Sequence, residues 1–140
     1  RGVSPDLAKA IVRTRTAVIA ALMVHRGEAD AMLAGIVGRY REKLRHVLDV
    51  LGLAPGVRVP GSMSALTSEE NTIFVCDTHV NANPDAGQIA EVTLMAAEKL
   101  KIFGLRPKVA MHSHSAYGRE DDAVACKMTD AQANMRAHDP

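Results

Sequence analysis

The chain has 140 residues, which is enough for one domain with a sizeable buried core. A net charge of +1 gives no electrostatic reason to bind nucleic acid or an anionic membrane, and an aromatic share of 3% leaves little surface for stacking on bases. No apolar run approaches the roughly 20 residues that span a bilayer. The two cysteines, Cys76 and Cys126, form neither a disulfide framework nor a zinc motif. We therefore expect a cytoplasmic protein with no nucleic-acid or membrane partner.

The first 27 residues are typical of helical structure. Ser4 and Pro5 form a helix start, because serine caps the first amide groups and proline suits the first helical position. Apolar residues continue at helical spacing as far as Met23, and Gly27 is the expected end. The polar stretch at residues 13–16 favours a break into two helices.

A short strand and a third helix, separated by glycines, are predicted next. Residues 30–34 are apolar and favour a strand, and the helix that follows Gly38 has a leucine-rich stripe and ends at Gly52. The free amide groups at the start of a helix favour an anion, and Arg39 would add positive charge there. Arg39 is therefore a candidate anion-binding residue, and the alternative is a solvated arginine beside a tight turn.

Strands and helices alternate through the rest of the chain. After a loop at residues 53–61 the expected elements are, in order, strands at residues 62–66 and 72–76, a helix from Pro84 to about Lys101, a strand at residues 109–111 and a helix from about Asp121. Because such alternation is typical of parallel sheets, we predict an α/β fold in which a mostly parallel sheet is covered by helices on both faces.

Polar side chains follow two of these strands, at the edge of the sheet where open α/β folds bind their ligands. The candidate ligand-binding residues are Thr78 and Asn81 after one strand, and Ser113, His114, Ser115, Tyr117 and Gly118 after the other. If the two strands are parallel neighbours, both polar ends share one crevice that suits an oxyanion. The alternative is that small polar residues and glycine serve only as ordinary turns.

Two other kinds of chemistry receive less support. Alternate residues of a strand share one face, so His112 with His114, and Asp77 with His79, could each supply two ligands to a metal. No acidic pair completes the ligand shell. A serine nucleophile at Ser113 or Ser115 is also conceivable, although no Gly-x-Ser-x-Gly motif surrounds either residue. We therefore expect neither a metal site nor a hydrolase triad in these residues.

Several motifs together resemble the phosphate acetyl/butyryl transferase family, and in particular the phosphotransacetylase-like domain at the carboxyl end of large bacterial NADP-dependent malic enzymes. The match runs from about Gly2 to Met128. The motifs are Glu28-Ala29-Asp30-Ala31-Met32, Gly35-x-Val37-Gly38-Arg39-Tyr40, Asp77-Thr78-His79-Val80-Asn81, Gln88-Ile89-Ala90-Glu91, Phe103-Gly104-Leu105-x-Pro107-Lys108-Val109-Ala110 and Ser113-His114-Ser115.

The resemblance implies a Rossmann-type, three-layer fold built from two α/β subdomains, of which residues 1–140 would be a partial domain. The chain starts at Arg1 rather than at a methionine, which fits a fragment. In the transferases, the cleft between the two subdomains binds coenzyme A and acetyl phosphate. In the malic enzymes the resemblance implies a domain that responds to acetyl-CoA, regulates the malate-oxidising domain and forms the oligomer. NADP and a divalent metal would be needed only in an upstream malic domain, and this segment would need no cofactor of its own.

The chain departs from the family's Ser-His-Ser-Asn-Phe-Gly-Ser signature. Ala116, Tyr117 and Arg119 replace the usual Asn, Phe and final Ser, which changes the polarity of the turn. Two functions follow as hypotheses. The first is an acetyl-CoA-responsive regulatory domain of an NADP-dependent malic enzyme, in a homo-oligomer. The second is a phosphate acetyltransferase whose catalytic carboxyl-terminal segment lies outside these residues.

Overall fold

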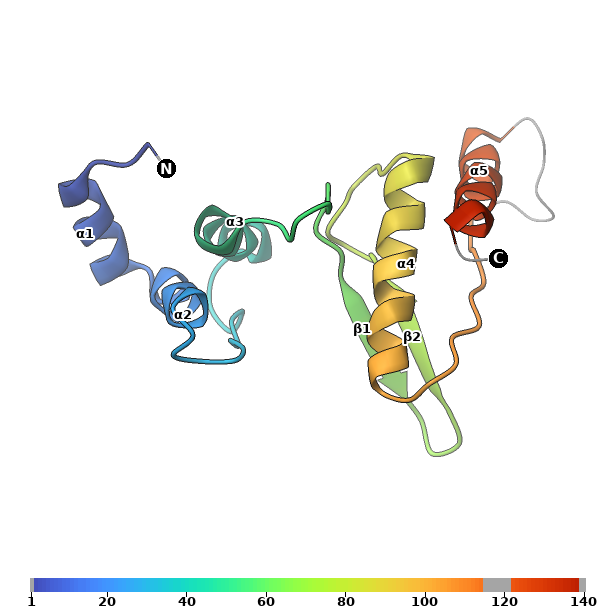
Figure 1. Cartoon of the computed structure of the whole chain (residues 1–140), viewed down its shortest axis with the longest axis horizontal. Coiled ribbons are helices and arrows are strands. Elements are labelled where there is room, and N and C mark those ends of the chain that lie inside the picture. Colours follow the sequence, from blue (N-terminus) through green and yellow to red (C-terminus); the bar gives the residue numbers. More distant parts are fainter. Residues whose placement is uncertain (1, 115–121, 139–140) are drawn as a thin grey trace. The chain divides into compact units, whose positions relative to one another are not determined.

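The structure is a computed structural model that describes residues 2–114 and 122–138 (Figure 1). The chain divides into two compact units, with the boundary between Pro55 and Gly56. This boundary lies in the loop predicted at residues 53–61. Among the described residues, no helix has the length and apolar character to cross a bilayer.

Unit 1 consists of three helices. They are α1 (Pro5–Thr14), α2 (Thr16–His25) and α3 (Tyr40–Leu51). The Ser4 hydroxyl accepts a hydrogen bond from the Leu7 amide and caps α1, and Arg15 separates α1 from α2 in an extended conformation. These observations confirm the predicted helix start and the predicted break.

The helix α2 packs against both α1 and α3. Its buried residues are Ala17, Val18 and Ala21, which allow the neighbouring helices to approach closely. Arg15 also donates to the Glu42 carboxylate of α3 over 2.7 Å, although both side chains are about half exposed. The packing of small side chains therefore matters more to unit 1 than this ion pair does.

Unit 2 consists of a β-hairpin and two helices. They are β1 (Met63–Thr67), β2 (Thr72–Cys76), α4 (Ala86–Ile102) and α5 (Ala123–His138). The strands pair antiparallel, with Met63 opposite Cys76 and Thr67 opposite Thr72. The hydroxyl and amide of Ser68 bond to Asn71 and close the four-residue turn.

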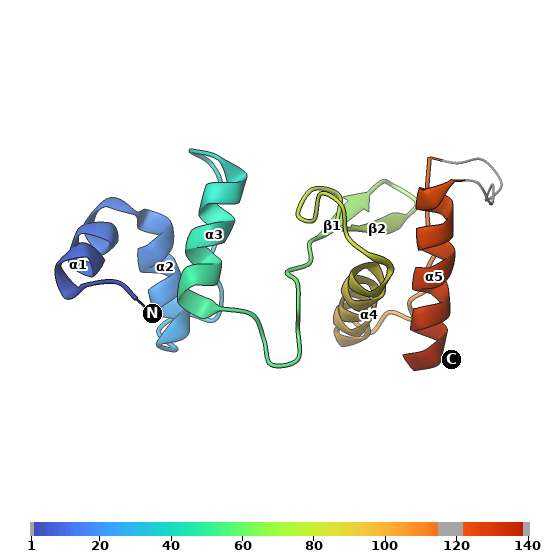
Figure 2. The same ribbon diagram turned by 90° about the horizontal axis from the view of Figure 1, so that it is seen from above.

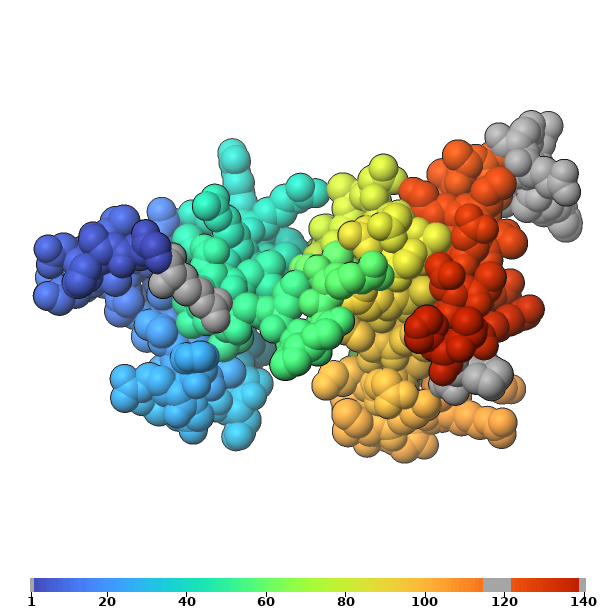
Figure 3. Space-filling model, turned by 45° about the horizontal axis from the view of Figure 1, so that its top comes forward, coloured from blue at the N-terminus to red at the C-terminus, as the bar shows by residue number. Residues whose placement is uncertain are grey.

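The helix α4 is fixed at its start by a reciprocal capping box. The Asp85 side chain accepts from the Gln88 amide over 2.8 Å, and the Gln88 side chain accepts from the Asp85 amide over 2.9 Å. The two views of the ribbon show α4 beside the hairpin and α5 beside α4 (Figures 1 and 2). The space-filling view shows the atoms of α4 and α5 in contact (Figure 3).

Several predicted elements agree with the structure. The strand at residues 72–76 has the predicted bounds, the strand predicted at residues 62–66 lies one residue later, and the helix that ends at Gly52 is present. The long helix begins at Ala86, after its Asp85 cap, and the last helix begins at Ala123. The chain is thus an α/β protein, as predicted.

Three details of the predicted sheet are wrong for the described residues. Residues 30–34 and 109–111 form no strand, and the sheet has two antiparallel strands in place of a mostly parallel set. The antiparallel pairing follows from the Ser68–Asn71 turn, because four residues can join only antiparallel neighbours. The other two segments have strand-like sequences, but a strand also needs a pairing partner, which the local sequence does not reveal.

Candidate ligand-binding site

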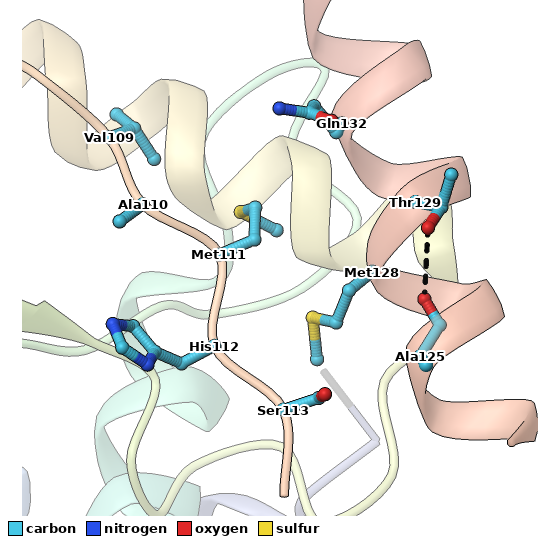
Figure 4. Close-up of a pocket in the computed structure, with 9 residues that line it drawn as sticks. All are labelled: Val109, Ala110, Met111, His112, Ser113, Ala125, Met128, Thr129 and Gln132. Carbon is cyan, nitrogen blue, oxygen red and sulfur yellow. Dashed lines mark hydrogen bonds between the residues drawn. The ribbon is translucent and has the colours of Figure 1, made fainter. Parts of the chain in front are cut away.

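A pocket of about 360 Å³ lies in unit 2, between residues 109–113 and one face of α5. Figure 4 shows that Met111 and Ser113 point toward α5, whereas His112 points the other way. This alternation is typical of extended backbone, although the segment forms no strand. The full lining consists of Val109, Ala110, Met111, His112, Ser113, Ala125, Met128, Thr129 and Gln132.

The α5 side of the pocket combines apolar and polar groups. Ala125, Met128, Thr129 and Gln132 are spaced at intervals of three and four residues, so they share one helix face. Thr129 donates its hydroxyl to the Ala125 carbonyl over 3.2 Å, which holds that side chain along the helix. The residue pattern selected neither Met128 nor Thr129 and Gln132 as candidates. Their common helical face was the signal that could have identified them.

The loop after β2 is ordered by its own polar groups. Asp77 has a left-handed backbone (φ 51°), and its carboxylate accepts from the Asn81 side chain over 2.8 Å. The same Asn81 amide donates to the Pro60 carbonyl over 2.8 Å. Thr78 is exposed and its hydroxyl lies 2.8 Å from His79 Nδ1. Asn81 thus has a structural role in connecting this loop to the segment before β1.

The candidate residues are only partly brought together. Ser113 lines the pocket, whereas Thr78 and Asn81 are not among its lining residues, so the shared crevice stays a prediction. Arg39 occupies the position before α3 in unit 1, makes no side-chain capping bond there and is exposed. Ser115, Tyr117 and Gly118 lie outside the described residues, as does the altered signature residue Arg119.

His114 adjoins the pocket lining and pairs with the start of α5. Its Nε2 lies 3.3 Å from Asp122 Oδ2, while Asp122 Oδ1 accepts from the Val124 amide over 2.8 Å. Asp122 therefore caps α5 with one oxygen and contacts the imidazole with the other. His114 is largely exposed, so the pair is worth little to stability.

The structure gives no support to a metal site in the residues it describes. None of their His, Cys, Asp and Glu side chains form a group of three that could hold a metal ion. His112 and His114, which the metal hypothesis paired with Asp77 and His79, are not gathered in this way.

Alkylation should distinguish the two cysteines. Burial, with a smaller contribution from the Asp77 carboxylate, raises the pKa of the Cys76 thiol, whereas Cys126 is exposed on α5. Because the thiolate is the reactive form, we expect iodoacetamide to modify Cys126 at least about tenfold faster than Cys76 at neutral pH. Mass spectrometry of timed samples measures both rates. Equal rates would show that Cys76 is not shielded.

Comparison with known proteins identifies the family to which the chain belongs. The family model of phosphate acetyl/butaryl transferases matches residues 1–140 of the chain. The chain belongs to this family. The prediction made from the motifs is therefore confirmed.

Curated family relatives fall into two groups. The NADP-dependent malic enzymes of Haemophilus influenzae and Escherichia coli are 39% and 44% identical to the chain over 140 residues. The phosphate acetyltransferase of Synechocystis is 31% identical over the same length. The chain spans about a fifth of the length of each of these relatives: 18% of both malic enzymes and 20% of the transferase.

A solved structure confirms the fold. The EutD phosphotransacetylase from Staphylococcus aureus matches with a TM-score of 0.77 and 23% identity. The match covers 97% of this chain and 41% of the EutD chain. The chain therefore has a phosphotransacetylase-like α/β fold, and it corresponds to part of a larger domain.

Proposed function

We propose that the chain is an acetyl-CoA-responsive regulatory and oligomerisation domain of an NADP-dependent malic enzyme. The observation that carries this proposal is its similarity to malic enzymes along its whole length. Those relatives are 39% and 44% identical to it, whereas the Synechocystis phosphate acetyltransferase is 31% identical. The parent reaction is the oxidative decarboxylation of malate to pyruvate, with NADP and a divalent metal bound by an upstream domain.

The pocket beside α5 is the proposed binding site of the effector, acetyl-CoA. Its volume of about 360 Å³ is within the range of small-molecule sites but is too small to enclose a whole coenzyme A. The methionine thioethers suit the acyl and pantetheine end, and the Ser113 hydroxyl and Gln132 amide can hydrogen-bond its carbonyl and amide groups. The imidazole of His114, which adjoins the pocket lining, can hydrogen-bond a phosphate oxygen.

Regulation would require acetyl-CoA to bind one arrangement of the oligomer better than another. A coupling free energy of about 1–3 kcal/mol changes malate affinity about 5-fold to 150-fold. We therefore expect acetyl-CoA to shift the malate dependence of NADP reduction in the full-length protein. A malate titration with and without saturating acetyl-CoA tests this, and coenzyme A without its acetyl group is the control. Superimposable curves would contradict the proposal.

The second candidate is a working phosphate acetyltransferase. It is favoured by the family model and by the similarity to the Synechocystis enzyme. The test is to supply acetyl phosphate and coenzyme A to the full-length protein and to follow acetyl-CoA formation by the absorbance of the thioester. We expect no turnover above the uncatalysed rate. Sustained turnover would favour the transferase over the regulatory domain.

A further inference from the structure

The pocket beside α5 has two distinct ends. Figure 4 shows Val109 and Gln132 toward one end and Ser113 and Ala125 toward the other, so residues 109–113 and α5 run in opposite directions along the pocket. We call these the Val109 end and the Ser113 end. The nine residues that line the pocket in the described part of the chain include no Lys, Arg, Asp or Glu. The charged side chains near the pocket therefore come from residues beyond its lining.

Exposed basic residues flank the Val109 end. Lys108 directly precedes Val109, and Arg136 follows Gln132 by four residues, which places it on the same face of α5. Arg106, two positions before Lys108, adds a further positive charge to this segment. Ammonium and guanidinium groups form strong, charge-assisted hydrogen bonds with phosphate oxygens. The Val109 end therefore suits an anionic part of a ligand.

The Ser113 end has a carboxylate instead. The start of a helix favours an anion, but Asp122 Oδ1 already accepts from the Val124 amide over 2.8 Å at the start of α5. Asp122 Oδ2 lies 3.3 Å from His114 Nε2, so a phosphate that reached this imidazole would also face the carboxylate. The Asp122 side chain is only 22% exposed, so water screens that repulsion in part. Phosphate groups are therefore favoured at the Val109 end.

We propose that acetyl-CoA lies in this pocket in one direction, with its phosphates against Lys108 and Arg136 and its thioester beside Ser113. This inference rests on the proposed function, because it takes acetyl-CoA as the ligand. The uncharged lining, with Met111 and Met128, suits the pantetheine chain between these two parts. The pocket is too small to enclose a whole coenzyme A, so the phosphate-bearing nucleotide extends beyond the lining, where the basic residues lie.

Calorimetric titrations of the full-length protein with two ligands test this direction. One ligand is acetyl-CoA, and the other is S-acetylpantetheine, which has the same thioester and chain but no phosphate. We expect Lys108→Gln and Arg136→Gln each to weaken acetyl-CoA binding about threefold to tenfold and to leave S-acetylpantetheine binding unchanged. The loss for acetyl-CoA should shrink at high salt, because both side chains are exposed.

The control substitution also removes one positive charge from α5. Lys127 lies outside the pocket lining and donates to the Asn83 side chain over 2.8 Å. Lys127→Gln keeps a donor for that bond and should leave the binding of both ligands unchanged. A loss of acetyl-CoA affinity in this variant equal to that in Arg136→Gln would overturn the proposal, since the position of the charge would then not matter.

The remaining outcomes separate this inference from the proposed function. Unchanged acetyl-CoA affinity in both Lys108→Gln and Arg136→Gln would overturn the proposed direction and leave the regulatory function intact. A loss confined to His114→Gln and to acetyl-CoA would place the phosphates at the Ser113 end and would likewise overturn it. Equal weakening of both ligands by the two basic variants would show that these residues shape the pocket and do not bind phosphate. An absence of acetyl-CoA binding by the unsubstituted protein would overturn both.

Discussion

Replacing Ala131 with leucine is expected to destabilise unit 2 by about 1–3 kcal/mol. Ala131 lies on α5 and has no exposed surface, and α5 packs along α4, where Ala90 and Ala96 are also buried (Figure 3). Because Ala131 has no exposed surface, the three carbons that leucine adds would have no free space and would force the residues packed around it apart. Chemical unfolding of the 140-residue chain, followed by circular dichroism, measures the change.

The same helix provides the matched control. Ala133 is two residues further along α5 and is exposed. Ala133→Leu adds the same atoms and hardly alters helix propensity, so its effect should stay within about 0.5 kcal/mol. Equal effects of the two substitutions would mean that α5 does not pack through Ala131.

Replacing Glu91 with alanine should lower the free energy of unfolding by about 1–2 kcal/mol. One carboxylate oxygen of Glu91 accepts from the Arg58 amide over 2.6 Å, and the other accepts from Arg58 Nε over 2.8 Å. Glu91 is 16% exposed while Arg58 is 63% exposed, so the bond to the amide contributes more than the partly solvated ion pair. This contact connects α4 to the segment before β1.

Glu98 on the same helix is the control for that experiment. It pairs with Lys101 over 2.8 Å, but both side chains are about half exposed or more. Glu98→Ala should therefore change the free energy of unfolding by no more than about 0.5 kcal/mol. If it costs as much as Glu91→Ala, a solvated ion pair contributes as much as the bond to the Arg58 amide.

The contribution of Glu91 should depend on pH in a definite direction. Its hydrogen bonds to the Arg58 amide and guanidinium hold the pKa of the Glu91 carboxyl below its usual value of 4.5. The stabilisation is therefore present above that value and is lost as pH falls through the lower pKa of the folded state. Unfolding of the chain and of Glu91→Gln between pH 3 and 7 should give a difference that is constant above about pH 6 and shrinks below about pH 4.5. A difference independent of pH would contradict this assignment.

Helices and their ends could be predicted because the deciding information is local. Ser4 caps α1, Asp85 and Gln88 form the capping box of α4, and the break at Arg15 coincides with the polar stretch. The sheet was harder to predict, since pairing depends on residues distant in the chain. The Ser68–Asn71 turn did contain the information that β1 and β2 are antiparallel.

The candidate site was predicted only in part. Ser113 lines the pocket because the extended segment before it directs alternate side chains to one side, although that segment is not the predicted strand, and ligand binding by Ser113 stays a prediction. The α5 contribution was missed, since a methionine on an amphipathic helix looks the same in sequence whether it fills a core or lines a pocket. Asn81 bonds to Pro60, a contact across 21 positions that no local pattern could indicate.

Calorimetric titration of the full-length protein with acetyl-CoA tests the central claim most directly. We expect one saturable binding event per chain, weakened about fivefold to tenfold by Ser113→Ala, which removes one hydrogen bond from the pocket, and unchanged by Asn134→Ala on the exposed side of α5. An absence of heat from acetyl-CoA binding would contradict the claim that this domain senses acetyl-CoA.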